Sequence, residues 1–128
     1  MSRIVLDASA ILALIHQEPG HEKLTPQLLA DAVASAVNLA EVHSKLVSSG
    51  WSSQEAWEDG TSPVQEVVSF DEEHAKIAGD LIAQTRPLEL SLGDRACLAL
   101  ALASKAPVYT ADRSWKGLKL KVRVHVIP

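Results

Sequence analysis

Short apolar runs typical of β-strands alternate with helix-like stretches along the whole chain. The strand-like runs are residues 3–6, 32–36, 64–70, 107–110 and 121–127. Helical periodicity marks residues 8–17, 24–31, 38–49, 52–59, 71–84 and 92–105. Strands that are separated by helices favour a mostly parallel sheet with helices packed against it. The sequence therefore predicts an α/β sandwich.

Local signals predict how several of these elements begin and pack. The stretch 92–105 is apolar nearly all round, so we expect this helix to be buried on more than one side. Thr25 is expected to cap a helix with Pro26 at its first position. In the helix predicted over 71–84, Ala75, Ala78 and Ile82 are expected to face inward. Residues 86–91 are expected to be extended, returning the chain to the far edge of the sheet.

Length, cysteine content and charge limit the possible classes of protein. The 128 residues suffice for one domain, 1–128, with a real core and no room for a second. One cysteine excludes an internal disulfide and suits a reducing cytosol, and the apolar run 4–15 is too short to span a bilayer. We therefore expect a cytoplasmic protein. A net charge of −4 argues against a generic polyanion-coating protein, but residues 105–128 hold six basic residues and one acid.

Four acidic residues lie beside apolar runs, where a carboxylate is costly to bury. They are Asp7 in VLDASA, Glu41 in NLAEV, Asp94 in GDRACLALA and Asp112 in YTAD. Helix capping would explain each one singly. Asp7 and Asp112 fit N-caps, and the spacings Asn38 to Glu41 and Ser91 to Asp94 fit capping boxes.

The four acids share one position relative to their helices, at or within one turn of the N-terminus. In a parallel sheet these N-termini meet at the carboxyl edge, where α/β folds bind ligands. Carboxylates that converge cannot all stay ionised without a counter-charge. Hard oxygen ligands favour Mg²⁺ or Mn²⁺, and the five histidines lack the spacing of a zinc site. Such clusters suit phosphoryl chemistry.

Taken together, the four motifs resemble the PIN-domain ribonucleases, and specifically VapC-type toxins of prokaryotic toxin–antitoxin pairs. The motifs are VLDASA at 5–10, NLAEV at 38–42, GDRACLALA at 93–101 and YTAD at 109–112. The resemblance implies a PIN-like three-layer sandwich with a mostly parallel five-stranded sheet. It also implies Mg²⁺ or Mn²⁺ and endonucleolytic cleavage of RNA that leaves a 5′-phosphate and a 3′-hydroxyl. The expected partners are a second copy of the chain and a VapB-type antitoxin whose C-terminal tail enters the active site.

The resemblance also assigns roles to individual residues. The catalytic, metal-binding quartet corresponds to Asp7, Glu41, Asp94 and Asp112. Asp7 and Asp94 resemble the most direct metal ligands. The supporting residues correspond to Ser9, Asn38 and Thr110, and Asn38 fits either a ligand contact or a helix cap.

Three further residues are candidates for contact with RNA. Arg95 and Arg113 each follow a site acid, and they fit either a phosphate contact or pairing with a neighbouring carboxylate. Trp115 is a candidate for stacking on a base.

Two other interpretations of the sequence compete with a toxin that cuts tRNA or rRNA loops. One is a non-catalytic α/β interaction domain whose acids only cap helices. The other is a PIN nuclease of RNA processing.

Overall fold

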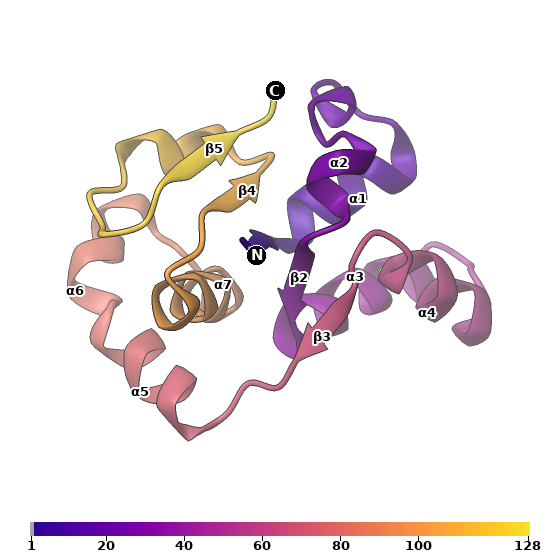
Figure 1. Cartoon of the computed structure of the whole chain (residues 1–128). Coiled ribbons are helices and arrows are strands. Elements are labelled where there is room, and N and C mark those ends of the chain that lie inside the picture. The colour runs from indigo at the N-terminus through magenta and orange to yellow at the C-terminus, as the bar shows by residue number, and fades with distance from the viewer. Residues whose placement is uncertain (1) are drawn as a thin grey trace.

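Five parallel strands form a single sheet in the structure, a computed structural model that describes residues 2–128 (Figure 1). The strands are β1 (Ile4–Leu6), β2 (Ala32–Ser35), β3 (Glu66–Val68), β4 (Val108–Thr110) and β5 (Val124–Val126). Their order is β3-β2-β1-β4-β5, and every neighbouring pair is parallel. The sequence prediction of a mostly parallel α/β sheet is confirmed, and each predicted strand is present in shorter form.

Within the described residues, seven α-helices flank the sheet. They are α1 (Ala8–His16), α2 (Pro26–Leu29), α3 (Ala36–Ser48), α4 (Ser53–Thr61), α5 (Glu72–Asp80), α6 (Ile82–Thr85) and α7 (Leu92–Ser104). The chain first winds outward from β1 through β2 to β3, and then returns to add β4 and β5 on the other side of β1. The direction of winding therefore reverses between β1 and β4, and this reversal opens a crevice at their carboxyl ends.

Two apolar clusters hold the layers together, one on each face of the sheet. Successive strand residues point to opposite faces. Leu6 accordingly packs with residues of α1 and α3, such as Ile11 and Leu39, whereas Val5 packs with residues of α7, such as Leu98. Helix α7 lies between the sheet and α5, which explains its nearly continuous apolar sequence. No helix within residues 2–128 has the length and apolar character needed to cross a bilayer.

The segment before α7 differs from the sequence prediction in two respects. The expected helix over 71–84 is divided at Leu81 into α5 and α6, and its buried face is formed by His74, Ala78 and Leu81. Ala75 is exposed and Ile82 is 40% exposed, so their predicted inward orientation was wrong. The spacing of the buried residues, four and then three, is the stripe that packs on α7. Residues 86–88 form a 3-10 turn rather than an extended return.

Candidate active site

Asp7 lies at the crevice between β1 and β4. It directly follows β1 and caps α1, and its Oδ1 accepts a hydrogen bond from the backbone N–H of Ala10 at 2.8 Å. The Thr110 hydroxyl donates to Asp7 Oδ2 at 2.6 Å, and the Ser9 hydroxyl lies 2.8 and 2.9 Å from the two carboxylate oxygens. The side chain is therefore fixed in position while only 3% of the residue remains exposed.

Burial raises the pKa of Asp7 from its ordinary 3.8 to about 6. Hydrogen bonds from Thr110, Ala10 and Ser9 oppose this shift, and the nearby charge of Asp94 adds to it. Within residues 2–128, no Lys, Arg or His side chain approaches Asp7 to salt-bridge distance. At neutral pH the site therefore contains a buried, ionised carboxylate without a paired cation.

Ser9 and Thr110 also join the two chain segments that meet at this point. The Ser9 hydroxyl accepts from the N–H of Ala111 at 2.9 Å, and the Thr110 hydroxyl accepts from the N–H of Asp112 at 3.0 Å. The loop after β4 is thus attached to the start of α1. Asp112 then caps the 3-10 turn Arg113–Gly117, as the sequence predicts.

Glu41 approaches the same crevice from α3. Asn38 is buried, and its amide donates to Glu41 Oε1 at 2.9 Å and to the carbonyl of Gly93 at 3.0 Å. Helix α3 begins at Ala36 and is capped by Ser35, so the expected capping box between Asn38 and Glu41 was wrong. Because Asn38 lies inside the first turn, it positions Glu41 against α7 instead.

A glycine makes room for the Glu41 carboxylate. A Cβ atom at Gly93 would lie 2.5 Å from both carboxylate oxygens of Glu41, closer than any real contact. The absence of a side chain at this position therefore allows α3 and α7 to approach each other with a carboxylate between them.

Asp94 occupies the first turn of α7. The Ser91 hydroxyl accepts from the N–H of Asp94 at 3.1 Å, and Asp94 Oδ2 accepts from the N–H of Ser91 at 3.0 Å. This reciprocal pair confirms the capping box that the sequence predicts.

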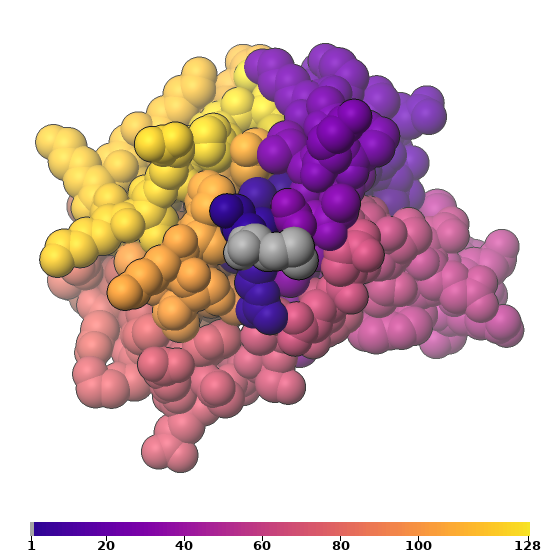
Figure 2. Space-filling model, viewed as in Figure 1, coloured from indigo at the N-terminus to yellow at the C-terminus, as the bar shows by residue number. Residues whose placement is uncertain are grey.

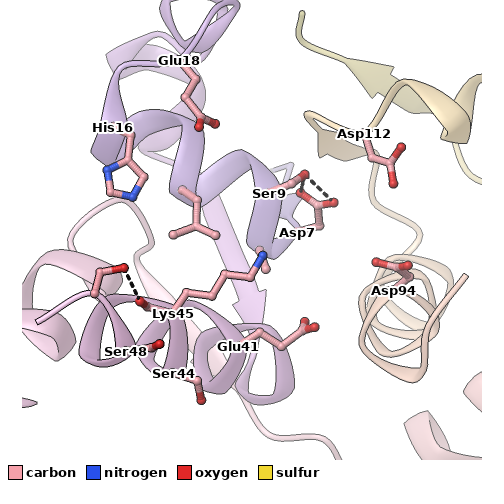
Figure 3. A pocket seen from close by; sticks show the side chains of 13 residues that line it. Asp7, Ser9, His16, Glu18, Glu41, Ser44, Lys45, Ser48, Asp94 and Asp112 are labelled. Atoms are coloured by element: carbon pink, nitrogen blue, oxygen red, sulfur yellow. Dashed lines mark hydrogen bonds between the residues drawn. The ribbon is translucent and has the colours of Figure 1, made fainter.

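All four predicted acids line one cavity of about 820 Å³. Figure 3 shows Asp7 and Ser9 at the start of α1, Glu41 on α3, Asp94 on α7 and Asp112 after β4. The carboxylates surround the cavity rather than meeting at one point. In the part of the chain that the structure describes, no three of them bring their oxygens within 4.8 Å of one another.

The cavity continues from the acids along α1 and α3. Its lining there includes His16, Glu18, Lys45, Ser48 and Ser49. Lys45 lies one turn beyond Glu41, and Figure 3 shows its side chain extending across the cavity toward the start of α1. Acids outnumber the cationic side chains around this cavity.

The donor chemistry fits a hard divalent cation. The ligands available are carboxylate oxygens from Asp7, Glu41, Asp94 and Asp112. Mg²⁺ retains several water molecules when it binds protein, so it suits carboxylates that surround a space without touching. The pKa of the Cys97 thiol also indicates that the acids together create a negative potential. Burial raises the pKa of its thiol, and the charges of Asp7, Asp94 and Glu41 raise it further.

A sequence model of the PIN domain matches residues 4–120. The chain belongs to the PIN domain family. Comparison with curated proteins gave no match for this sequence.

Several solved structures with the same fold are VapBC complexes or VapC toxins. DNA-bound VapBC from Salmonella typhimurium matches at a TM-score of 0.78 and 15% identity, covering 100% of both chains. VapBC2 from Rickettsia felis, bound to a promoter DNA fragment, matches at 0.77 and 16%, covering 98% of both. Mycobacterium tuberculosis VapC20, described as a Sarcin-Ricin loop cleaving toxin, matches at 0.68 and 18%, covering 94% of this chain and 98% of that one. At these identities the likeness establishes the fold.

The three residues expected to contact RNA do not line the acidic cavity of this PIN domain. Trp115 is fully buried in the apolar cluster beside α7, so the expectation that it stacks on a base was wrong. The 3-10 turn after Asp112 directs the indole into the core.

The two arginines lie outside the cavity as well. Arg95 donates to the carbonyl of Ala78 at 2.8 Å and so attaches α7 to α5. Arg113 is exposed, and neither arginine pairs with a carboxylate within residues 2–128. The predicted pairing with a neighbouring carboxylate is therefore wrong for both arginines, and a phosphate contact stays a prediction.

Sequence reasoning did not assign two contributors to this PIN-domain site, Gly93 and Lys45. A glycine directly before Asp94, in an otherwise apolar helix, was the available signal for the first. For Lys45 the signal was its spacing of four from Glu41, which places the two on one helix face.

Proposed function

We propose that this PIN domain is a metal-dependent endoribonuclease of the VapC type. It hydrolyses phosphodiester bonds in RNA and acts as the toxin of a toxin–antitoxin pair. The observation that carries the proposal is the buried Asp7 carboxylate, which has a raised pKa and faces Glu41, Asp94 and Asp112 across one cavity. A site of this kind gains most from a divalent cation, because the cation compensates several carboxylates at once.

In this proposal Asp7 and Asp94 are the direct ligands of Mg²⁺ or Mn²⁺, and Glu41 and Asp112 complete the site or orient water. The bound ion supplies activation of a water molecule and charge stabilisation at the phosphate. Ser9 and Thr110 hold the Asp7 carboxylate in one orientation through their hydroxyl groups. Asn38 does the same for Glu41. Attack by water leaves a 5′-phosphate and a 3′-hydroxyl.

A domain whose acids only cap helices is the main competing explanation. Asp7, Asp94 and Asp112 do cap helices or turns, but Glu41 caps none and is held by Asn38 inside α3. A capping carboxylate normally has a lowered pKa, because the helix N-terminus favours its charge. At Asp7 burial outweighs this effect and raises the pKa to about 6, so the ionised form of this carboxyl gains from a cation.

The relatives support a proposal for the substrate class and the partners. We propose structured RNA, with tRNA or rRNA loops as the targets. VapC20, which shares the fold, is described as cutting the Sarcin-Ricin loop. A VapB-type antitoxin is proposed as the partner, with its C-terminal tail in the part of the cavity between α1 and α3. A homodimer is the proposed assembly.

Cleavage assays with matched variants test the proposal. The purified chain should cut tRNA or rRNA with Mg²⁺ or Mn²⁺ and not with EDTA, and sequencing of 5′ ends identifies the sites. Asp7→Asn and Asp94→Asn should keep the far-ultraviolet circular dichroism of the wild type and lose cleavage by a factor of at least about 10². Asp59→Asn, an exposed acid of α4, is the control and should cut normally. Wild-type cleavage rates in both site variants would show that the assignment is wrong.

The same assays separate the toxin from a PIN nuclease of RNA processing. A toxin should cut one mature RNA at one loop and arrest growth when it is expressed, and a co-expressed antitoxin should restore growth. A processing enzyme should trim precursor RNA without arresting growth.

A further inference from the structure

A second, basic groove lies at the opposite edge of the sheet from the acids. It has a volume of about 520 Å³, and Lys105, Lys121, Arg123 and His125 are among its lining residues. No acidic side chain of residues 2–128 lines it. In a chain of net charge −4, this is a marked local excess of positive charge.

The walls of the basic groove come from four parts of the chain, one of which is Ile4 at the start of β1. In Figure 1, β4 and β5 lie on one side and α2 on the other, and Leu28 of α2 contributes to the lining. Figure 2 shows this face of the molecule, with the violet atoms of α2 beside the yellow atoms of the C-terminal strand. The groove lies over β4 and β5 on the sheet face that also carries α1.

Two planar side chains form part of this surface. Tyr109 on β4 and His125 on β5 are neighbours in register, and their rings stack with centroids 4.5 Å apart and an interplanar angle of 15°. Both residues remain partly exposed. The pKa of His125 is lowered by burial and by Arg123, so its ring is neutral at pH 7.5 and offers a flat surface rather than a charge.

The cations of the groove are not used in salt bridges. Lys105 has an ordinary structural explanation, because it caps the C-terminus of α7 in a left-handed conformation, with φ of 53°. Lys121 and Arg123 have no such explanation. They are exposed in the segment just before β5, and no carboxylate of the described chain pairs with either.

We propose that the basic groove binds a single-stranded segment of the RNA that the acidic site cuts. Phosphates of that segment contact Lys121 and Arg123, and bases stack against the Tyr109–His125 pair. Aromatic surfaces combined with cations along a groove are the usual means of holding single strands without reading their sequence. This proposal rests on the proposed function for the identity of the RNA.

The distance between the two sites fits one RNA molecule. Between three residues of chain, counted from Tyr109, and five, counted from Pro107, separate the groove from Asp112, which corresponds to about 10–17 Å at the rise of a β-strand. A few nucleotides of single strand cover such a span. The groove would thus hold RNA flanking the cut, which compensates for the repulsion between phosphates and the acidic cavity.

A charge-matched pair of double variants tests the groove. Fluorescence anisotropy with a labelled single-stranded oligoribonucleotide, in EDTA, measures binding by the full chain without cleavage. Lys121→Gln with Arg123→Gln should weaken binding at least about tenfold and lower the salt slope by about 1.4, since each lost contact to single-stranded RNA removes about 0.7. The control is Lys116→Gln with Lys119→Gln, which removes two charges from the same exposed segment outside the groove. It should weaken binding less than about threefold.

His125→Ala separates stacking from charge. It should weaken RNA binding by about three- to tenfold and leave the salt slope unchanged, because it removes a planar surface and no charge. Equal effects of the two double variants would show that RNA binding depends on the overall positive charge of the segment and not on the groove, and would overturn the proposal. Unchanged RNA binding in the groove double variant would also overturn it, and would point to a protein as the occupant.

The two proposals fail separately. A chain that binds RNA through the groove but does not cut it with Mg²⁺ or Mn²⁺ contradicts only the proposed activity. A chain that cuts RNA while the groove double variant binds normally contradicts only the groove.

Discussion

Replacing Asp7 by Asn should stabilise the metal-free protein while it abolishes activity. The raised pKa of Asp7 means that its ionised form is disfavoured in the folded state. A shift from 3.8 to about 6 corresponds to about 3 kcal/mol at neutral pH. Asn has the same shape and also caps helices well, so its Oδ1 can still accept from Ala10. The NH₂ group of the Asn side chain is a donor at the position where the Asp7 carboxylate accepts from Thr110. The Thr110 hydroxyl must therefore reorient, at a cost of about 1 kcal/mol. The expected net gain is about 2 kcal/mol.

The pH dependence of this gain has a definite sign. Below pH 3.8 Asp7 is protonated in both the folded and the unfolded chain, so it costs nothing. As pH rises through the interval from 3.8 to about 6, the unfolded chain loses the proton first and the stability of the wild type falls. Above pH 6 the penalty is constant. Asp7→Asn should therefore be about 1 kcal/mol less stable than the wild type near pH 3.5 and about 2 kcal/mol more stable at pH 8.

Urea unfolding followed by tryptophan fluorescence in EDTA measures this difference, because the fully buried Trp115 reports loss of the core. With an m value of about 1.5 kcal/mol/M, a gain of 2 kcal/mol moves the midpoint up by about 1.3 M. Mn²⁺ should then stabilise the wild type at pH 8 and leave Asp7→Asn unchanged. Asp59→Asn should respond to neither pH nor metal in this way. A variant that is less stable than the wild type at pH 8, or equally shifted at both pH values, would refute the reasoning.

Three further predictions test individual contacts. Gly93→Ala should reduce cleavage by at least about 10²-fold, because the added Cβ displaces the Glu41 carboxylate. Gly79→Ala is the control, since its Cβ meets nothing within 4 Å. It should cut normally and gain up to about 1 kcal/mol in urea unfolding. Equal activity in the two glycine variants would contradict the role of the cleared space. Lys45→Met should bind Mn²⁺ about tenfold more tightly in calorimetry, because the wild-type lysine places a positive charge among the acids. An unchanged Mn²⁺ affinity would show that the Lys45 ammonium group does not act on the acids. Trp115→Phe should lower stability by about 1–3 kcal/mol and leave kcat intact, and a lost kcat in a folded protein would restore a substrate role for the indole.

The acidic site could be predicted because its residues follow from chain connectivity. Asp7 and Asp112 come directly after strands, and parallel strands present their carboxyl ends on one edge. Asp94 was recognisable from its spacing to Ser91. These positions depend on short-range rules, so a single sequence contains them.

Other features depend on contacts between distant segments and were not predictable in the same way. The burial of Trp115 is decided by the packing of a 3-10 turn on the α7 face of the sheet, which leaves no periodic signal in the sequence. The predicted inward face of α5 was wrong. The helix breaks at Leu81, and its packing on α7 buries His74 and leaves Ala75 exposed. The space at Gly93 is visible only when α3 lies beside α7.

The hydrogen bond between Asp7 and Thr110 joins residues 103 positions apart in the chain. Because β4 pairs directly with β1 at the centre of the sheet, a hydroxyl translated 103 residues later completes the surroundings of Asp7. During synthesis, Asp7 therefore lacks its hydrogen bond from Thr110 until β4 has left the ribosome. A chain that terminates early, or is cut between α7 and β4, lacks Thr110 and Asp112 together. Such fragments should not cut RNA, because they lack the Thr110 hydroxyl that holds Asp7 and the Asp112 carboxylate that lines the cavity.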